Sequence, residues 1–167
     1  MSLRKICEYP DPVLRETTLE VTEFDDQLKE LIKDMWETMY ASDGIGLAAP
    51  QIGVSKKIVV IDYDGEKYTL INPEIISAEG SVTREEGCLS FPDIYVKVDS
   101  PEKMTVKYLD EDGTMITKEL EDFQACVFSH EIDHLRGRLL IDRVSPLKRQ
   151  FMKKRIAKKA TEEKKCK

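Results

Sequence analysis

The sequence has little that would take the chain out of the cytoplasm. None of its 167 residues belongs to an apolar run long enough for a membrane span, and the first ten residues contain no signal-peptide core. Hydrophobic residues make up 41% of the chain and charged residues 35%, proportions that are typical of globular proteins in water. We therefore expect a cytoplasmic protein without a membrane partner.

Cysteine is also scarce, and none of the four cysteines lies in a C-x-x-C pair. Cys7, Cys88, Cys126 and Cys166 are scattered along the chain. In a reducing compartment such cysteines are free thiols or metal ligands rather than a disulfide framework.

Histidine is the rarest informative residue, because the only two histidines lie four positions apart. They belong to the segment His130-Glu131-Ile132-Asp133-His134. On a helix, residues i and i+4 share one face, so both imidazoles can bind one metal ion. A glutamate next to the first histidine can reach a water bound to that ion. The pattern therefore predicts a metal site.

Two common ways of completing such a site do not suit this sequence. One class adds a glycine and a third histidine, but the position of that histidine is occupied by Leu140. Another class uses a carboxylate on a following helix. Here the only acids of that helix, Glu162 and Glu163, lie near its end and are poorly placed.

Cysteine is the remaining source of a third ligand. Cys126 lies about 12 Å from position 134 along a helix that rises ~1.5 Å per residue, so one ion cannot bind both. Cys126 is better explained as part of an apolar wall. Cys88 lies in Glu86-Gly87-Cys88-Leu89-Ser90. From the residues alone, Cys88 is either a metal ligand or a buried thiol on a strand.

The hydrophobic pattern predicts an α+β fold rather than alternating strands and helices. An amphipathic helix is expected at about 25–41. Asn72-Pro73 is expected to end a strand. Further helices are expected from 121 to 137 and from 146 onward. We expect one catalytic domain over 1–167, with mostly antiparallel strands around the histidine-bearing helix. The predicted strands are 57–63, 68–71, 94–98, 104–109 and 115–120.

The net charge of −6 conceals a strong asymmetry along the chain. Residues 148–167 contain ten basic and two acidic residues, whereas residues 1–147 contain 16 basic and 30 acidic residues. The C-terminal helix and tail, 146–167, therefore carry the positive charge. This arm either docks on a polyanion or is a solvated helix that keeps the protein in solution.

Three segments together resemble the peptide deformylases. They are Gly44–Gln51 (GIGLAAPQ), Glu86–Ser90 (EGCLS) and His130–Gly137 (HEIDHLRG). The opening residues Pro10–Arg15 (PDPVLR) are also similar to the family's N-terminus. The resemblance covers nearly the whole chain, and the three motifs occur in the family's order and at about its separations.

The resemblance implies a metal-dependent hydrolase that removes the formyl group from N-formyl-methionine of nascent polypeptides and releases formate. It implies that Cys88, His130 and His134 hold the metal and that Glu131 handles the proton of the attacking water. The side-chain amide of Gln51 and the backbone N–H of Leu89 would face the developing oxyanion.

The resemblance also suggests where the substrate binds. Ile45, Gly46 and Gly87 would offer their backbone to an extended peptide. Phe123, Val127 and Cys126 are candidates for the methionine pocket, although each is almost equally well explained as a core residue. The five substrate-binding predictions are Ile45, Gly46, Gly87, Phe123 and Val127.

The family is usually credited with one Fe²⁺ ion, and Zn²⁺, Ni²⁺ and Co²⁺ accept the same ligands. The nascent-chain substrate suggests that the basic arm docks on ribosomal RNA, and no DNA partner is expected. Two positions depart from the family pattern. Ser129 stands where Gln is more frequent, and Tyr95 lies where some members carry Arg near the pocket mouth.

Two other functions remain at this point. A general H-E-x-x-H zinc metallopeptidase explains the histidines but not Glu86–Ser90 or Gly44–Gln51. A structural zinc protein without catalysis would need a fourth protein ligand, for which only distant thiols remain.

Overall fold

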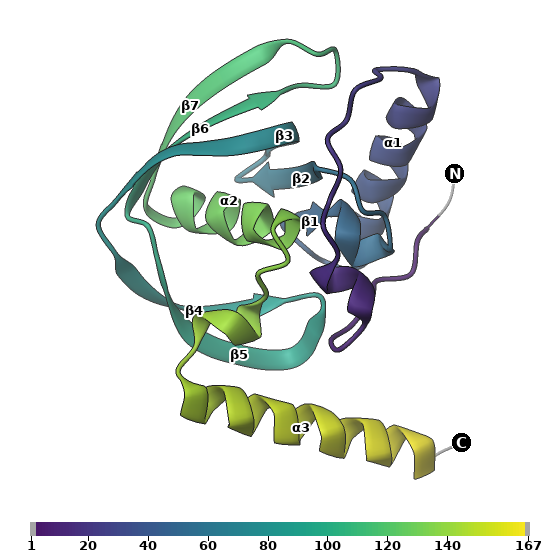
Figure 1. The fold of residues 1–167 in the computed structure, drawn as a ribbon, viewed down its shortest axis with the longest axis vertical. Coiled ribbons are helices and arrows are strands. Elements are labelled where there is room, and N and C mark those ends of the chain that lie inside the picture. Colours follow the sequence, from purple (N-terminus) through teal and green to yellow (C-terminus); the bar gives the residue numbers. More distant parts are fainter. Residues whose placement is uncertain (1–2, 166–167) are drawn as a thin grey trace.

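The computed structural model describes residues 3–165 (Figure 1). Its helices are η1 (Pro12–Arg15), α1 (Asp26–Ala41), η2 (Ala49–Ile52), α2 (Asp122–Leu135), η3 (Leu140–Arg143) and α3 (Pro146–Lys165), where η marks a 3-10 turn. Its strands are β1 (Gly46–Ala48), β2 (Ile58–Tyr63), β3 (Glu66–Glu79), β4 (Val82–Cys88), β5 (Phe91–Ser100), β6 (Lys103–Leu109) and β7 (Met115–Glu121).

The strands form two antiparallel sheets. Five strands pair in the order β1-β2-β3-β6-β7, and β4 pairs with β5 in a separate hairpin. The five-stranded sheet curves around α2, and the β4-β5 hairpin lies on the other side of that helix (Figure 1). The mixture of helices and antiparallel strands is the predicted α+β class.

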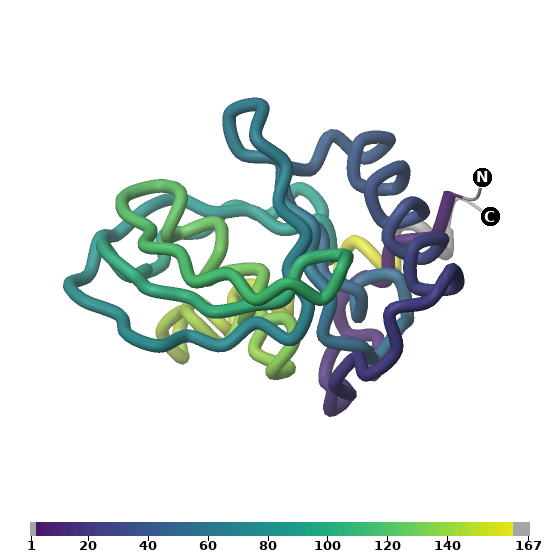
Figure 2. Tube along the Cα trace, turned by 90° about the horizontal axis from the view of Figure 1, so that it is seen from above, coloured from purple at the N-terminus to yellow at the C-terminus, as the bar shows by residue number. Residues whose placement is uncertain are grey.

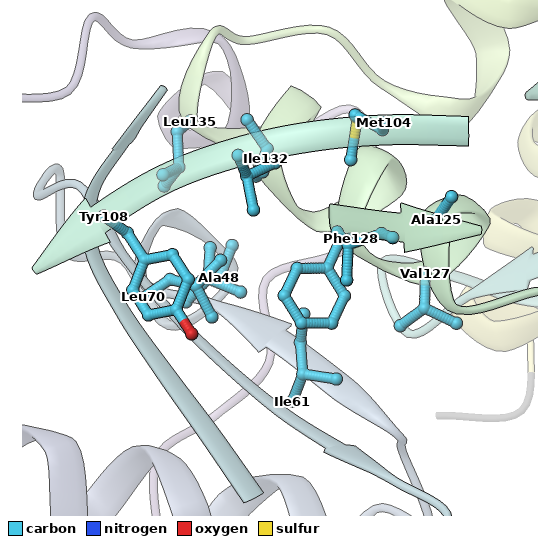
Figure 3. Packing of buried hydrophobic residues seen from close by; sticks show 13 residues of the cluster. Ala48, Ile61, Leu70, Met104, Tyr108, Ala125, Val127, Phe128, Ile132 and Leu135 are labelled. Carbon is cyan, nitrogen blue, oxygen red and sulfur yellow. The ribbon is translucent and has the colours of Figure 1, made fainter. Parts of the chain in front are cut away.

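Helix α2 is enclosed by the strands. Eleven of its fourteen residues are buried, which explains why its sequence is apolar on more than one face. Ala125, Phe128 and Ile132 pack with residues of the five-stranded sheet (Figure 3). The sheet contributes Ala48, Val59, Ile61, Leu70, Met104, Val106, Tyr108 and Leu120 to this cluster.

Strand β2 is buried on both faces, so its sequence is continuously apolar rather than alternating. Val59 and Ile61 belong to the cluster around α2, whereas Ile58 and Val60 belong to a second cluster with α1. Helix α1 covers this second face of the sheet with the apolar stripe predicted from the sequence (Figure 2). It begins one residue after Asp25, whose side chain accepts a hydrogen bond from the backbone N–H of Leu28.

The prediction that Asn72-Pro73 ends a strand is wrong. Strand β3 runs through both residues to Glu79, and its register against β6 shifts between Ile71 and Glu74. Asn72 has φ of 52°, a conformation that asparagine tolerates better than most residues. Pro73 lies at this irregularity, where the missing N–H removes no regular ladder bond. Strand β4 was not predicted, and β5 begins three residues before the predicted start at 94.

Helix α3 packs beside the β4-β5 hairpin (Figure 1). Met152 is buried and Ile156 is partly buried in a third cluster, together with Leu14, Phe91 and Leu140. Most of the remaining described residues of α3 are exposed. No helix within residues 3–165 combines the length and apolar character needed to cross a membrane.

Candidate metal centre

Cys88, His130 and His134 meet at the end of β4 and the C-terminal half of α2. Their candidate ligand atoms all lie within 4.8 Å of one another, and the Cys88 Sγ is 3.3 Å from the His134 Nε2. The histidines share one face of α2 because they are four residues apart. Cys88 reaches them because the β4-β5 register shifts between Gly87 and Cys88, at the turn of the hairpin.

These three side chains fit a divalent metal ion. Ligands held at ~2.0–2.3 Å in a tetrahedral arrangement lie about 3.3–3.8 Å apart, which agrees with the sulfur–nitrogen distance of 3.3 Å. Both histidines are buried. Burial lowers the pKa of His134 well below its ordinary value, so its imidazole is neutral, as a metal ligand must be. One thiolate and two imidazoles suit zinc, iron, nickel or cobalt.

Glu86 orients His130. Its Oε1 lies 3.0 Å from the His130 Nδ1. An ionised carboxylate only accepts hydrogen bonds, so Nδ1 carries the proton and Nε2 is free to bind a metal. Burial alone lowers the pKa of His130, but its hydrogen bonds to Cys88 and Glu86 raise it above the ordinary value. Cys88 and Glu86 thus favour a positive charge at the His130 imidazole, and a bound metal ion would supply that charge.

Glu131 lies beside the three residues with one oxygen unused. Its side chain is buried, and its Oε2 has no hydrogen-bond partner among residues 3–165. Burial raises the pKa of Glu131 to about 7. Gly46 makes room for it, since a Cβ on Gly46 would lie 2.8 Å from the Glu131 Cγ. A carboxylate so placed can accept and return a proton.

Gln51 is held with its amide donor facing the site. The backbone N–H of Ala48 donates to the Gln51 Oε1 at 3.0 Å, which fixes the orientation of the amide. The Gln51 Nε2 then donates to the Ser90 Oγ at 3.2 Å and lies 3.6 Å from the Cys88 Sγ. Leu89, the second predicted oxyanion residue, follows Cys88 directly in the hairpin turn.

A cavity of about 140 Å³ opens beside Glu131 and His130. Four of the five predicted substrate-binding residues line it: Ile45, Gly87, Phe123 and Val127. Cys126 lines it too, although its thiol also donates to the Glu86 Oε2 at 3.2 Å, a polar contact that the apolar-wall interpretation did not include.

Gly46, the fifth predicted residue, lines a neighbouring groove of about 360 Å³. Ile45, Gly87, Cys88, Tyr95 and Glu131 also line this groove. The Tyr95 ring packs so closely on Gly87 that a Cβ there would lie 2.7 Å from the Tyr95 Cε1. A larger groove of about 480 Å³ between α3 and residues 90–94 contains none of the three candidate ligands.

Sequence reasoning did not identify the polar residues behind the histidines. Glu86 and Ser90 lie within the quoted EGCLS segment, but neither was assigned a role. Arg143 also reaches this region, from η3, with its Nη1 3.3 Å from the Glu86 Oε1. No spacing rule links Arg143 to Glu86, because they are 57 positions apart.

Comparison with known proteins gives a consistent result. The sequence profile of the polypeptide deformylase family matches residues 3–150. The peptide deformylase of Acidobacterium capsulatum is 50% identical over 163 residues, covering 95% of this chain and 96% of the relative. Peptide deformylase 1 of Shewanella oneidensis is 46% identical over 166 residues, covering 98% and 99% of the two chains.

Solved structures show the same similarity in three dimensions. A crystal structure of a peptide deformylase from Legionella pneumophila superposes with a TM-score of 0.92 at 44% identity, covering 97% of this chain and 98% of that one. The peptide deformylase of Ehrlichia chaffeensis in complex with actinonin superposes with a TM-score of 0.90 at 36% identity, covering 95% and 98% of the two chains.

Proposed function

The chain belongs to the peptide deformylase family, and from that premise we propose that Cys88, His130 and His134 hold its metal ion. Members of this family are metallohydrolases, and this chain removes the N-formyl group of nascent polypeptides. The observation that carries the assignment of the site is the meeting of three ligand atoms within 4.8 Å beside a buried carboxylate with an unused oxygen.

Glu131 is the proton carrier of this proposal. When bound, a divalent metal supplies a Lewis acid that makes water a competent nucleophile near neutral pH. The unused Oε2 of Glu131 accepts the proton of that water and later delivers it to the leaving amine. The close packing of Gly46 on Glu131 restricts the movement of the carboxylate between these two steps.

Gln51 and Leu89 stabilise the negative charge that develops on the formyl oxygen. The support for Gln51 is that its Oε1 is occupied by the Ala48 N–H, so that only the Nε2 donor end faces Cys88. The backbone N–H of Leu89 follows the ligand Cys88 directly and is the second donor. Loss of one such donor typically costs ~10²–10³ in rate.

The cavity of about 140 Å³ receives the methionine side chain. Phe123, Val127 and Cys126 give it apolar and sulfur-bearing walls, which suit a thioether. The formyl carbon bears only hydrogen, so a cramped site between Glu131 and Cys88 can admit formyl and exclude acetyl.

The peptide backbone binds between two strand edges. β1 is the terminal strand of the five-stranded sheet, and β4 pairs only with β5 in the described structure. Ile45, Gly46 and Gly87 bring both segments to the groove of about 360 Å³, where an extended peptide can pair with them.

The function and the site are tested together by measuring formate release from formyl-Met and acetyl-Met peptides. We expect release from the formylated peptide alone and no cleavage of internal peptide bonds. Cleavage of internal bonds without formate release would contradict the proposal.

Fe²⁺ is the metal that we propose for the native enzyme, with Zn²⁺, Ni²⁺ and Co²⁺ as substitutes. Cys88 is only half-buried, so its thiolate is open to oxidation when iron is bound. Protein purified without oxygen should show formate release that follows its iron content and declines in air. Activity that follows zinc content and is stable in air would contradict the choice of iron.

The basic helix α3 docks on ribosomal RNA in this proposal, and the reaction takes place in the cytoplasm without DNA or membrane. The support is that the lysines at 148, 153 and 154 are exposed, so their charge is available to a polyanion.

A further inference from the structure

Arg143 is a buried arginine that lies behind the metal site without touching it. Its side chain is only 5% exposed, although arginine is rarely buried without a specific role. It comes from η3, after the chain has left α2 and turned back at Gly137. The turn places its guanidinium between α2 and the β4-β5 hairpin, the two elements that carry the candidate ligands.

The guanidinium faces acceptors on both of these elements. Nη1 lies 3.3 Å from the Glu86 Oε1, and Nη2 donates to the Ser100 Oγ at 3.0 Å and to the Asp99 carbonyl at 3.1 Å. Nε lies 3.7 Å from the Asp133 Oδ2. A planar guanidinium can satisfy several acceptors in fixed directions, which a lysine ammonium cannot do in the same way.

Glu86 transmits this order to the metal ligand. The Oε1 that faces Arg143 is the same oxygen that lies 3.0 Å from the His130 Nδ1. The Ser100 hydroxyl, itself held by Arg143, donates to the Glu86 Oε2 at 2.8 Å. Arg143 therefore fixes both oxygens of the carboxylate that orients His130, one directly and one through Ser100.

We propose that Arg143 is a positioning residue for the metal ligand His130 and that it acts through Glu86. Without the guanidinium, Glu86 is a buried carboxylate with no arginine or lysine beside it among residues 3–165, and it turns toward water. His130 then loses the partner that directs its Nε2 toward the metal. The inference rests on the proposed metal site, but it does not depend on the deformylation reaction.

The test measures metal release rather than turnover. Cobalt-loaded wild-type protein, Arg143→Met and Arg143→Lys are mixed with a chelator, and the decay of the cobalt absorption is followed. We expect Arg143→Met to lose cobalt about tenfold faster, the lower end of the effect typical of residues that orient ligands, and Arg143→Lys to be intermediate. Wild-type protein that binds no cobalt would reject the metal site, whereas equal release from wild type and Arg143→Met would reject only the role of Arg143.

Arg138→Met is the matched control. Arg138 also faces the Asp133 Oδ2, at 3.9 Å, but it is 55% exposed and, within residues 3–165, pairs with Asp133 rather than with Glu86. This variant should release cobalt like wild type. If Arg143→Met does not fold, Arg143→Lys carries the comparison, and release from it at the wild-type rate overturns the proposal.

A double-mutant cycle separates positioning from general loosening. In a Glu86→Gln background, Arg143→Met should cause little further acceleration, because the path to His130 is already broken. If the double variant released cobalt faster by the product of the two single accelerations, Arg143 would act independently of Glu86. That result would overturn the inference.

Discussion

Among single residues, Glu131 combines burial, an unpaired oxygen and a pKa raised to about 7. It is buried beside two histidines, and its Oε2 is unpaired within the described chain. A structural carboxylate in this position would normally have both oxygens satisfied, because an unpaired buried polar atom costs about 1–3 kcal/mol. Asp34 and Glu37 also have a buried oxygen without a partner, but Glu131 differs from them in lying beside the candidate metal ligands with its pKa raised to about 7. This combination fits a group that exchanges protons with a substrate.

Replacement of Glu131 tests this interpretation. Glu131→Gln keeps the volume and removes the proton acceptor, so formate release should fall by ~10²–10⁴. Metal content, measured on the same sample, should stay at the wild-type level because Glu131 is not a ligand. Glu30→Gln is the control, since Glu30 is exposed on α1, lines neither the cavity nor the groove, and should leave the rate nearly unchanged. Deformylation that persists in Glu131→Gln would contradict the assignment.

The histidines and Cys88 differ in how far sequence can identify them. His130 and His134 are four residues apart on one helix, so local geometry alone places them together. Cys88 is 46 positions from His134, and only the fold brings the two within 3.3 Å. The residues alone could not separate a ligand from a buried thiol at Cys88, and the resemblance to a family supplied that distinction. Arg143 has neither a local spacing nor a quoted motif, and sequence reasoning missed it.

At the level of elements, the helices were easier to predict than the strands. The period of the apolar residues gave α1 to within a residue because its stripe faces a single cluster. Strand β4 was missed because its burial is mostly intermediate or exposed, so it has no apolar run. Asn72-Pro73 was misread because a local turn signal was overridden by a long-range contact. The Asn72 side chain accepts from the Val21 N–H at 2.8 Å and donates to the Val21 carbonyl at 2.9 Å.

Asn72 should therefore matter for stability. Asn72→Ala removes both bonds to Val21 and places an alanine at φ of 52°, and we expect it to lower the free energy of unfolding by about 2–4 kcal/mol. Asn72→Gly removes the same bonds but tolerates the backbone conformation, so its loss should be smaller. Urea denaturation of the three proteins measures the difference. Equal stability of Asn72→Ala and wild type would show that the side chain does not anchor the irregularity in β3.

A salt bridge joins the 3-10 elements η1 and η3, and its contribution to stability should depend on pH in a direction that the pKa of Asp142 gives. Arg15 of η1 pairs with Asp142 of η3, and its Nη1 also donates to the Gly137 carbonyl at 3.1 Å. Burial alone raises the pKa of Asp142, but the hydrogen bonds from Arg15 and from the Leu139 N–H hold it below the ordinary value. The bridge therefore stabilises the fold above the unfolded-state pKa, and this contribution disappears as pH falls through the folded-state value.

Comparison with Asp142→Asn isolates this contribution. At neutral pH the variant should unfold at a lower urea concentration than wild type. The difference between the two urea midpoints should narrow as the pH falls to the ordinary pKa of an aspartate carboxyl and below it. Both proteins are measured without metal, so that protonation of the metal ligands affects them equally. A gap that stays constant with pH would show that the charge of Asp142 contributes nothing.

At the scale of the whole molecule, charge and packing are distributed unequally. The body up to residue 147 is acidic, and the arm from 148 is basic. The arm is not a free tail, because Met152 is buried and the Arg149 Nε donates to the Ile141 carbonyl at 3.1 Å. Removing the whole helix would therefore disturb the cluster beside the hairpin as well as the charge. The sequence predicted the helix and its charge, but its attachment to the body depends on contacts with distant segments.

Ribosome docking through α3 is tested by changing charge without removing the helix. Substituting Gln for Lys148, Lys153 and Lys154 alters three exposed side chains and leaves Met152 in place. Affinity for ribosomes should fall. A plot of the logarithm of the binding constant against the logarithm of salt concentration should become shallower by about 2–3, because roughly one counterion is released per phosphate contact. Formate release from a short peptide should not change, since the substituted lysines are not among the residues lining the catalytic groove.

The matched control makes the same change of charge elsewhere. Lys29, Lys33 and Lys56 are exposed and lie outside the arm, so substituting Gln for all three should leave the salt slope almost unaltered. If both triple variants lost affinity equally, net charge rather than the arm would govern the encounter. If neither lost affinity, the solvated-helix interpretation of the arm would be correct. A selective loss in the α3 variant is the outcome that assigns the basic arm to docking, because the two variants have the same net charge and differ only in where the cations were removed.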